Sequence, residues 1–274
     1  MNNYLTRKVF IKEGYVVKKT NRKSDKIYQY LNSQNVHNVV YPEKKYVLNN
    51  EKYLEFPYYD EIDYPSSKKL LNLKDAIMEL HDKTKTMKVI KKRNMRYFYK
   101  IYYKLDMKFS LLELYIRECE NNVNHNDNDW IILSKYHIYL DCKKELYRLQ
   151  KKLHNLVDKN TSAYYAVNHF KPDITHLVNN SLISLDHAKI AIVTSDIAKM
   201  YVANEYIDID WFSFIDSWLN NYEGEIYKVY FKFLVLYIFI LNVNIDNVNE
   251  YTSLNSYVQI NNKIKKFLLQ FNTY

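Results

Sequence analysis

Apolar and polar residues alternate along the first 60 residues, a pattern that is typical of β-strands. Residues 8–11 and 15–18 flank a turn at Glu13-Gly14 and predict a β-hairpin. Apolar residues at 27–31 have helical spacing, and Asn49-Asn50 predicts a second turn. Further strands are predicted at 39–41, 46–48 and 52–56. The amino-terminal part is therefore predicted to be rich in β-strands.

Beyond Pro57 and Pro65 the apolar residues repeat at helical spacing instead. The first helix has an apolar face made of Leu70, Leu73, Ile77 and Leu80. Further helices are predicted at 95–121, 129–158, 195–204, 209–221, 224–242 and 253–271. A strand-like stretch at 181–192 interrupts this helical region. The pattern predicts an α+β fold with a small β-rich domain at 1–60 and a large, mainly helical domain at 61–274.

Glycine is nearly absent from the chain, because Gly14 and Gly224 are the only two in 274 residues. Loops that wrap phosphates closely usually need glycine, since the backbone must approach the ligand. A glycine-rich nucleotide loop and a dinucleotide-binding fingerprint are therefore both excluded.

The formal net charge of +9 raises the question of a nucleic-acid partner. The lysines are scattered, however, and the modest cluster consists of Lys88, Lys91, Lys92, Arg93 and Arg96. Lys, Asn, Tyr and Ile are all abundant and all have A/T-rich codons, so codon usage accounts for much of this charge. We therefore do not expect a nucleic-acid partner.

The two cysteines, Cys119 and Cys142, lack the spacing of metal ligands, and they favour the reduced interior of a cell over a disulfide framework. The opening residues 1–8 are polar, which argues against a signal peptide. The most apolar stretch has an uninterrupted part of 11 residues at 233–243, whereas a membrane span needs about 20. We expect a cytoplasmic protein with no membrane span, in which this stretch is a buried helix.

The segment 169–198 carries three short motifs: His169-Phe-Lys-Pro-Asp-Ile-Thr-His-Leu-Val178, Leu182-Ile-Ser-Leu-Asp-His-Ala188 and Asp196-Ile-Ala198. Their order and spacing resemble the catalytic core of aminoglycoside phosphotransferases and choline kinases. That family has His-Gly-Asp, four further residues and Asn, then Ile-Asp-Phe or Ile-Asp-Trp, then Asp-Leu-Ala at the start of a helix. The resemblance implies a two-lobed, protein kinase-like fold whose helical lobe contains this loop. It places His169 and Asp196 at structural positions of the motif.

The three positions that carry the family's chemistry are replaced. By the same resemblance, Lys171 stands at the catalytic base, His176 at an Asn that holds a metal, and Ser184 at the principal metal-binding Asp. A protonated lysine accepts no proton from a substrate hydroxyl. Magnesium prefers hard oxygen ligands, whereas a serine hydroxyl carries no charge and imidazole is a poor ligand for it. The resemblance therefore implies a retained fold that has lost most of its phosphotransfer.

Two further residues concern the nucleotide. Lys18, in Tyr15-Val-Val-Lys18, resembles the strand lysine that pairs with nucleotide phosphates in such kinases. Asp186 lies two residues beyond the lost metal position and is a candidate for a residual acid. We predict no metal site and assign no cofactor, because ATP and magnesium are expected only if activity is retained.

The leading interpretation is a catalytically degenerate kinase-like protein, a pseudokinase, which binds an unidentified protein or small-molecule partner without efficient phosphotransfer. One alternative is an active but atypical ATP-dependent phosphotransferase that acts on an alcohol group and uses Asp186 and Asp173 for metal. A second alternative is a basic nucleic-acid-binding protein, whose affinity would fall steeply with salt.

Overall fold

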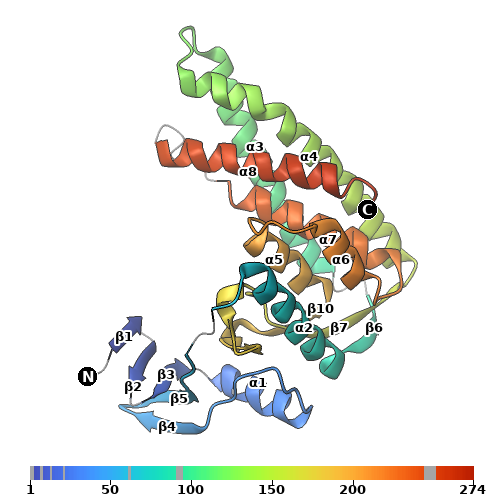
Figure 1. Cartoon of the computed structure of the whole chain (residues 1–274). Helices are drawn as coiled ribbons and strands as arrows, with labels where there is room; N and C mark the ends of the chain where they lie inside the picture. The colour runs from blue at the N-terminus through green and yellow to red at the C-terminus, as the bar shows by residue number, and fades with distance from the viewer. Residues whose placement is uncertain are drawn as a thin grey trace. The chain divides into compact units, whose positions relative to one another are not determined.

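The computed structural model describes residues 3–6, 9–12, 14–20, 22–60, 63–90, 95–243 and 251–274. The chain forms two compact units (Figure 1). The first combines Met1–Met87 with Tyr164–Ile209, and the second combines Lys88–Ala163 with Asp210–Tyr274. The predicted boundary near residue 60 follows the change from strands to helices rather than the contacts between residues, and it stays a prediction.

The amino-terminal strands form an antiparallel sheet in the order β1-β2-β3-β5-β4, drawn in blue in Figure 1. They are β1 (Asn3–Thr6), β2 (Val9–Lys12), β3 (Tyr15–Thr20), β4 (Lys44–Leu48) and β5 (Glu51–Pro57). The hairpin beside Gly14 is confirmed, with Val9 opposite Lys18, although the predicted turn residue Glu13 lies outside the described residues. Asn49 and Asn50 have positive φ of 50° and 61°, which a tight two-residue hairpin turn requires. The predicted helix at 27–31 lies within α1 (Arg22–Ser33).

The predicted strand at 39–41 is wrong. Val39 forms an isolated bridge with Leu182. The N–H of Val40 donates to the carbonyl of Leu182 over 3.0 Å. The run of apolar residues suggested a strand, and Val39 and Val40 are indeed buried. A strand, however, needs a ladder of paired residues rather than one bridge.

The rest of the first unit surrounds a long loop between two paired strands. Strand β7 (Ser162–Asn168) runs antiparallel to β10 (Lys189–Ile192), with Asn168 opposite Lys189. The loop between them contains the short hairpin of β8 (Leu177–Val178) and β9 (Ser181–Leu182), and α5 (Thr194–Asn204) follows β10. Because the ends of the loop are paired, residues far apart in sequence come together around it. Four strands were not predicted from the sequence: β1, β6 (Thr86–Val89), β7 and β8.

Helix α2 (Ser66–Thr84) has the apolar face that the sequence predicts. Leu70, Leu73, Ile77 and Leu80 are all fully buried. His81, which follows them, is also fully buried. This face positions the loop between β7 and β10, because α2 contacts β9 and the short turn Ile174–His176.

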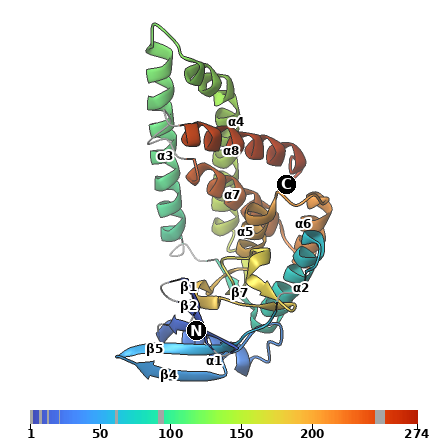
Figure 2. The ribbon, with the colours of Figure 1, turned by 60° about the vertical axis from the view of Figure 1, so that its left-hand side comes forward.

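The second unit is helical, and its helices confirm the predicted segments. They are α3 (Met95–Asn121), α4 (Asp127–Asp158), α6 (Trp211–Leu219), α7 (Glu225–Leu241) and α8 (Tyr251–Gln270). Figure 2 shows α3 and α4 side by side, and α4 also contacts α7 and α8. Helix α4 begins with a reciprocal capping box between Asn126 and Asp129.

Helix α7 is the most apolar stretch of the chain and is a core helix of this unit. Most of its side chains are buried, including Phe231, Phe233 and Phe239. Its buried Lys232 forms an ion pair with Glu145 of α4 at 2.8 Å. None of the helices in the described part of the chain is both long and apolar enough to cross a membrane.

Candidate functional site

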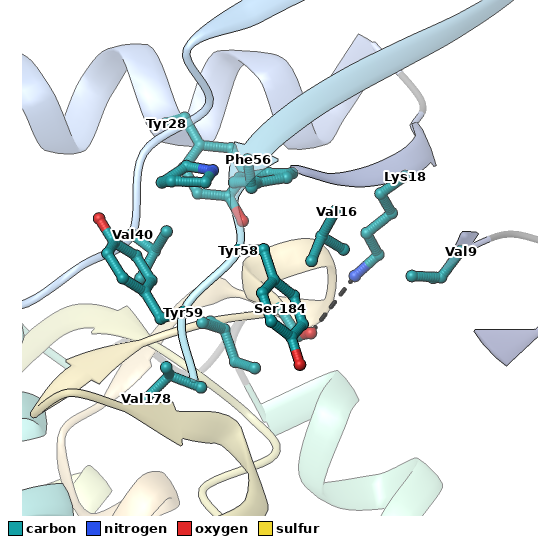
Figure 3. A pocket seen from close by; sticks show the side chains of 12 residues that line it. Val9, Val16, Lys18, Tyr28, Val40, Phe56, Tyr58, Tyr59, Val178 and Ser184 are labelled. Carbon is teal, nitrogen blue, oxygen red and sulfur yellow. Dashed lines mark hydrogen bonds between the residues drawn. The ribbon is translucent and has the colours of Figure 1, made fainter. Parts of the chain in front are cut away.

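A cavity of about 240 Å³ opens in the first unit, between the amino-terminal sheet and the segment that follows β8 (Figure 3). Most of its lining is aliphatic or aromatic: Val9, Val16, Tyr28, Val40, Phe56, Pro57, Tyr58, Tyr59, Val178 and Ile183. Lys18 and Ser184 contribute the polar edge. Pockets for drug-sized ligands usually measure roughly 300–1,000 Å³, so this cavity suits a single flat ring system better than a whole nucleotide.

Strand β3 places Lys18 in the cavity. Successive strand residues point to opposite faces, so Val16 and Lys18 line the cavity while Val17 is fully buried on the other face. The ammonium of Lys18 forms an ion pair with the carboxylate of Asp186. It also donates to Ser184 Oγ at 3.4 Å, as the dashed line in Figure 3 shows. The structure therefore brings together three of the residues that the sequence analysis singled out.

Ser184 has a backbone conformation that is uncommon for a residue other than glycine, with φ 63° and ψ 46°. The turn Leu185–His187 follows it and carries Asp186. The hydroxyl of Tyr28 on α1 accepts a hydrogen bond from the N–H of Leu185 at 3.4 Å. Burial, and then the negative charge of Asp186, raise the pKa of Tyr28, so its hydroxyl stays neutral. These contacts hold Asp186 beside Lys18.

Asp196 organises the loop that follows β7. It lies in the first turn of α5 and is fully buried. Its carboxylate accepts hydrogen bonds from the N–H groups of His169 and Phe170 at 2.7 and 2.8 Å. The side chain of His81 provides a third contact at 3.1 Å. A buried carboxylate with several donors is well satisfied and acts as an anchor for the backbone.

His169 connects this loop to the cavity. Its Nδ1 accepts from the N–H of Lys171 at 3.3 Å, and its Nε2 donates to the carbonyl of Ile183 at 2.7 Å. This network assigns the neutral tautomer with the proton on Nε2. Burial holds the pKa of His169 below its ordinary value, although the charge of Asp196 acts in the opposite direction. The ring therefore ties Lys171 to the residue that precedes Ser184.

Lys171 and His176 occupy the outer side of the loop. The side chain of Lys171 is exposed, and no carboxylate pairs with its ammonium among the residues that the structure describes. His176 Nδ1 donates to the backbone carbonyl of Lys171 at 2.6 Å. The His176 ring lies 5.5 Å from the His169 ring, centroid to centroid. The Nδ1 of His176 therefore holds the backbone of the loop.

Phe170 stands between His169 and Lys171 and was missed by the sequence analysis. Its φ of 68° lies in the left-handed region, where residues other than glycine are strained. The ammonium of Lys199 lies 3.9 Å from the centre of its ring and donates to its carbonyl at 3.2 Å. The ammonium of Lys189 lies 5.3 Å from the same ring centre. One feature of the sequence could have pointed to Phe170: the family motif that this segment resembles has glycine at this position.

The polar groups of the site do not fit magnesium. Ser184 offers a neutral hydroxyl that already accepts from Lys18, and the carboxylate of Asp186 is paired with the same ammonium. Asp173, the second carboxylate of the active-enzyme alternative, accepts from the N–H and hydroxyl of Thr175, both at 2.8 Å. In the part of the chain described here, no group of three or more His, Cys, Asp or Glu residues could hold a metal ion. A magnesium ion would lack the cluster of free carboxylate oxygens that it prefers.

The sequence matches no model of a protein family and shows no significant similarity to a curated protein. The structure, in contrast, is similar to solved kinases. An aminoglycoside phosphotransferase from Alicyclobacillus acidocaldarius has a TM-score of 0.61 at 11% identity, over 100% of this chain and 91% of that one. A choline/ethanolamine kinase family protein from Mesorhizobium loti has a TM-score of 0.54 at 10% identity, over 98% of this chain and 87% of that one. The chain therefore has the α+β, kinase-like fold of aminoglycoside phosphotransferases and choline kinases.

Proposed function

We propose that this chain is a catalytically degenerate kinase-like protein that binds a ligand or a partner without efficient phosphoryl transfer. The observation that carries the proposal is the chemical state of Lys171, His176 and Ser184. They present an ammonium, an imidazole bonded to the backbone, and a hydroxyl bonded to Lys18. None of the three supplies the negative charge that a metal-assisted transfer requires.

The base position supports the same conclusion. A general base must accept the proton of the substrate hydroxyl as the phosphoryl group moves. The side chain of Lys171 is exposed, and its ammonium has no lone pair to offer. A positive charge there also opposes a divalent cation nearby.

The cavity supports ligand binding. Its lining is mostly apolar, with residues from the amino-terminal sheet, and Lys18 places a positive charge at its edge. Such a site suits a ligand with a flat apolar group, and the base of a nucleotide is one example. ATP and magnesium remain cofactors only of the active-enzyme alternative.

We also propose the cytoplasm as the location of the protein. Cys119 and Cys142 are both buried and unpaired, which agrees with a reducing compartment.

The test is a turnover measurement. The purified chain is incubated with ATP, magnesium or manganese and a panel of compounds with alcohol groups, and ADP release is followed. We expect no release above that of the Asp186→Ala variant. Metal-dependent release that Asp186→Ala abolishes would establish the atypical phosphotransferase instead, with Asp186 as the acid that remains.

A further inference from the structure

The loop between β7 and β10 carries positive charge on several sides of Phe170. Lys171 follows Phe170 in sequence, while Lys189 on β10 and Lys199 on α5 both lie over its ring. We call Lys171, Lys189 and Lys199 the lysine cluster. The ammonium groups of Lys189 and Lys199 come from two separate elements and lie over the same ring, and Lys171 is the next residue along the loop.

The carboxylates of this region already have partners other than the lysine cluster. Asp196 is buried and accepts from two backbone N–H groups and His81. Asp186 pairs with Lys18, and Asp173 caps Thr175. Among the described residues, no carboxylate forms an ion pair with Lys171 or Lys189, and both side chains are exposed. The charge of the cluster is therefore left uncompensated where it meets solvent.

His187 lies in sequence between the cavity residue Ser184 and Lys189 of the cluster. It is exposed and ends the turn that carries Asp186. Burial, and then the charges of Lys171, Lys18 and Lys189, hold the pKa of His187 below its ordinary value, although Asp186 acts in the opposite direction. Lys18 of the cavity and two lysines of the cluster, Lys171 and Lys189, therefore all act on His187. A group of like charges favours a bound anion.

Lys199 has a positioning role within the cluster. Its side chain is half-buried, and its ammonium is bonded to the carbonyl of Phe170. Burial, followed by the repulsion of Lys189 and Lys171, holds the pKa of Lys199 below its ordinary value, while Asp196 opposes this shift. Lys171 and Lys189, which are exposed, are the two that can reach a ligand.

We propose that the lysine cluster binds a phosphate-class oxyanion directly, without a divalent cation, as the charged part of a ligand whose apolar part occupies the cavity. The proposal rests on the proposed function and gives it a ligand class, a small organic phosphate. Ammonium groups hold phosphate oxygens through short, charge-assisted hydrogen bonds. A lysine at the position of the catalytic base, with Lys189 and Lys199 nearby, thus favours an anion where a cation would otherwise be expected.

The test is calorimetric titration of the full chain with inorganic pyrophosphate in EDTA. Lys171→Glu and Lys189→Glu should each weaken binding by about tenfold. Lys83→Glu is the matched control, since Lys83 is exposed on α2 of the same unit and undergoes the same charge change. Lys171→Gln and Lys189→Gln repeat the test with a smaller perturbation if a reversed charge prevents folding.

Three results would overturn the proposal: no pyrophosphate binding in EDTA, binding that requires magnesium, or an equal loss in the Lys83→Glu control. Inorganic phosphate and AMP are titrated in parallel to distinguish a free anion from a phosphate ester. Tighter binding of AMP than of phosphate supports the joint use of cavity and cluster, and equal binding contradicts it. These titrations are independent of ADP release, so the oxyanion site and the absence of turnover can fail separately.

Discussion

Asp196 illustrates how one residue maintains the candidate site. Its carboxylate accepts from the N–H groups of His169 and Phe170 and contacts His81. Asp196, His169 and His81 are fully buried. Replacing Asp196 by alanine would leave buried donors without an acceptor. We expect Asp196→Ala to lower the free energy of unfolding by about 3 kcal/mol or more.

Denaturant unfolding measures this effect. Asp82→Ala is the control, because Asp82 is exposed on α2 and its ion pair with Lys85 lies at the surface. Its effect should stay within about 0.5 kcal/mol. A similar small loss for Asp196→Ala would show that the loop does not depend on this carboxylate.

His169 makes stability depend on pH. Its pKa is lowered in the folded chain by burial, so the unfolded chain binds a proton more readily. Stability is therefore complete above the unfolded pKa, near 6.5, and is lost as the pH falls below it. The slope should approach about 1.4 kcal/mol per pH unit at most.

The measurement is the free energy of unfolding at several pH values between 7.5 and 5. His169→Gln should flatten the profile, since the amide can still donate to the Ile183 carbonyl but does not titrate. His187, whose pKa is also lowered, acts in the same direction and would leave a weaker residual slope. An unchanged profile in His169→Gln would assign the pH dependence to other groups.

At the scale of elements, an ion pair between Glu145 of α4 and Lys232 of α7 joins the two helices, and the two residues differ in their other ionic contacts. Lys232 is buried and depends on Glu145, whereas Glu145 is also held by Arg148 at 2.6 Å. Glu145→Gln would leave a buried ammonium without its counter-charge and should cost about 3 kcal/mol. Lys232→Met removes the charge that needed a partner and should cost less than about 1 kcal/mol. Urea unfolding of the two variants compares these losses, and equal losses would contradict the asymmetry.

The elements also show what the sequence could and could not predict. Helices α3, α4, α6 and α8 were found because one face of each meets the core, which imposes helical spacing on the apolar residues, and α7 was found as a long apolar stretch. Strand β7 was not predicted, because both of its faces are buried toward its end and its sequence lacks a clean alternation of apolar and polar residues. The site divides in the same way. The family resemblance pointed to His169 and Asp196 as structural positions, whereas the cavity wall and the strained Phe170 depend on contacts that form only in the folded chain.

At the scale of the whole molecule, ligand binding and global stability are linked. A ligand that binds only the folded chain stabilises it by an amount that grows with its concentration, about 2.7 kcal/mol at one hundred times Kd. We expect ATP in EDTA to raise the melting temperature at least as much as ATP with magnesium does. The reason is that the polar residues lining the cavity are Lys18 and Ser184, and the carboxylate of Asp186 is already paired with Lys18.

A cavity-filling variant tests whether this shift arises at the proposed site. Val40→Phe places a ring against the cavity, which Val40 lines, and should remove the ATP shift. Val47→Phe makes the same change on the exposed side of β4 and should retain it. A shift that appears only with magnesium would mean that a metal–nucleotide site persists, and it would make Asp186 the residue on which activity depends. Retention of the shift in both variants would place the nucleotide elsewhere, because Val40 borders the cavity and Val47 does not.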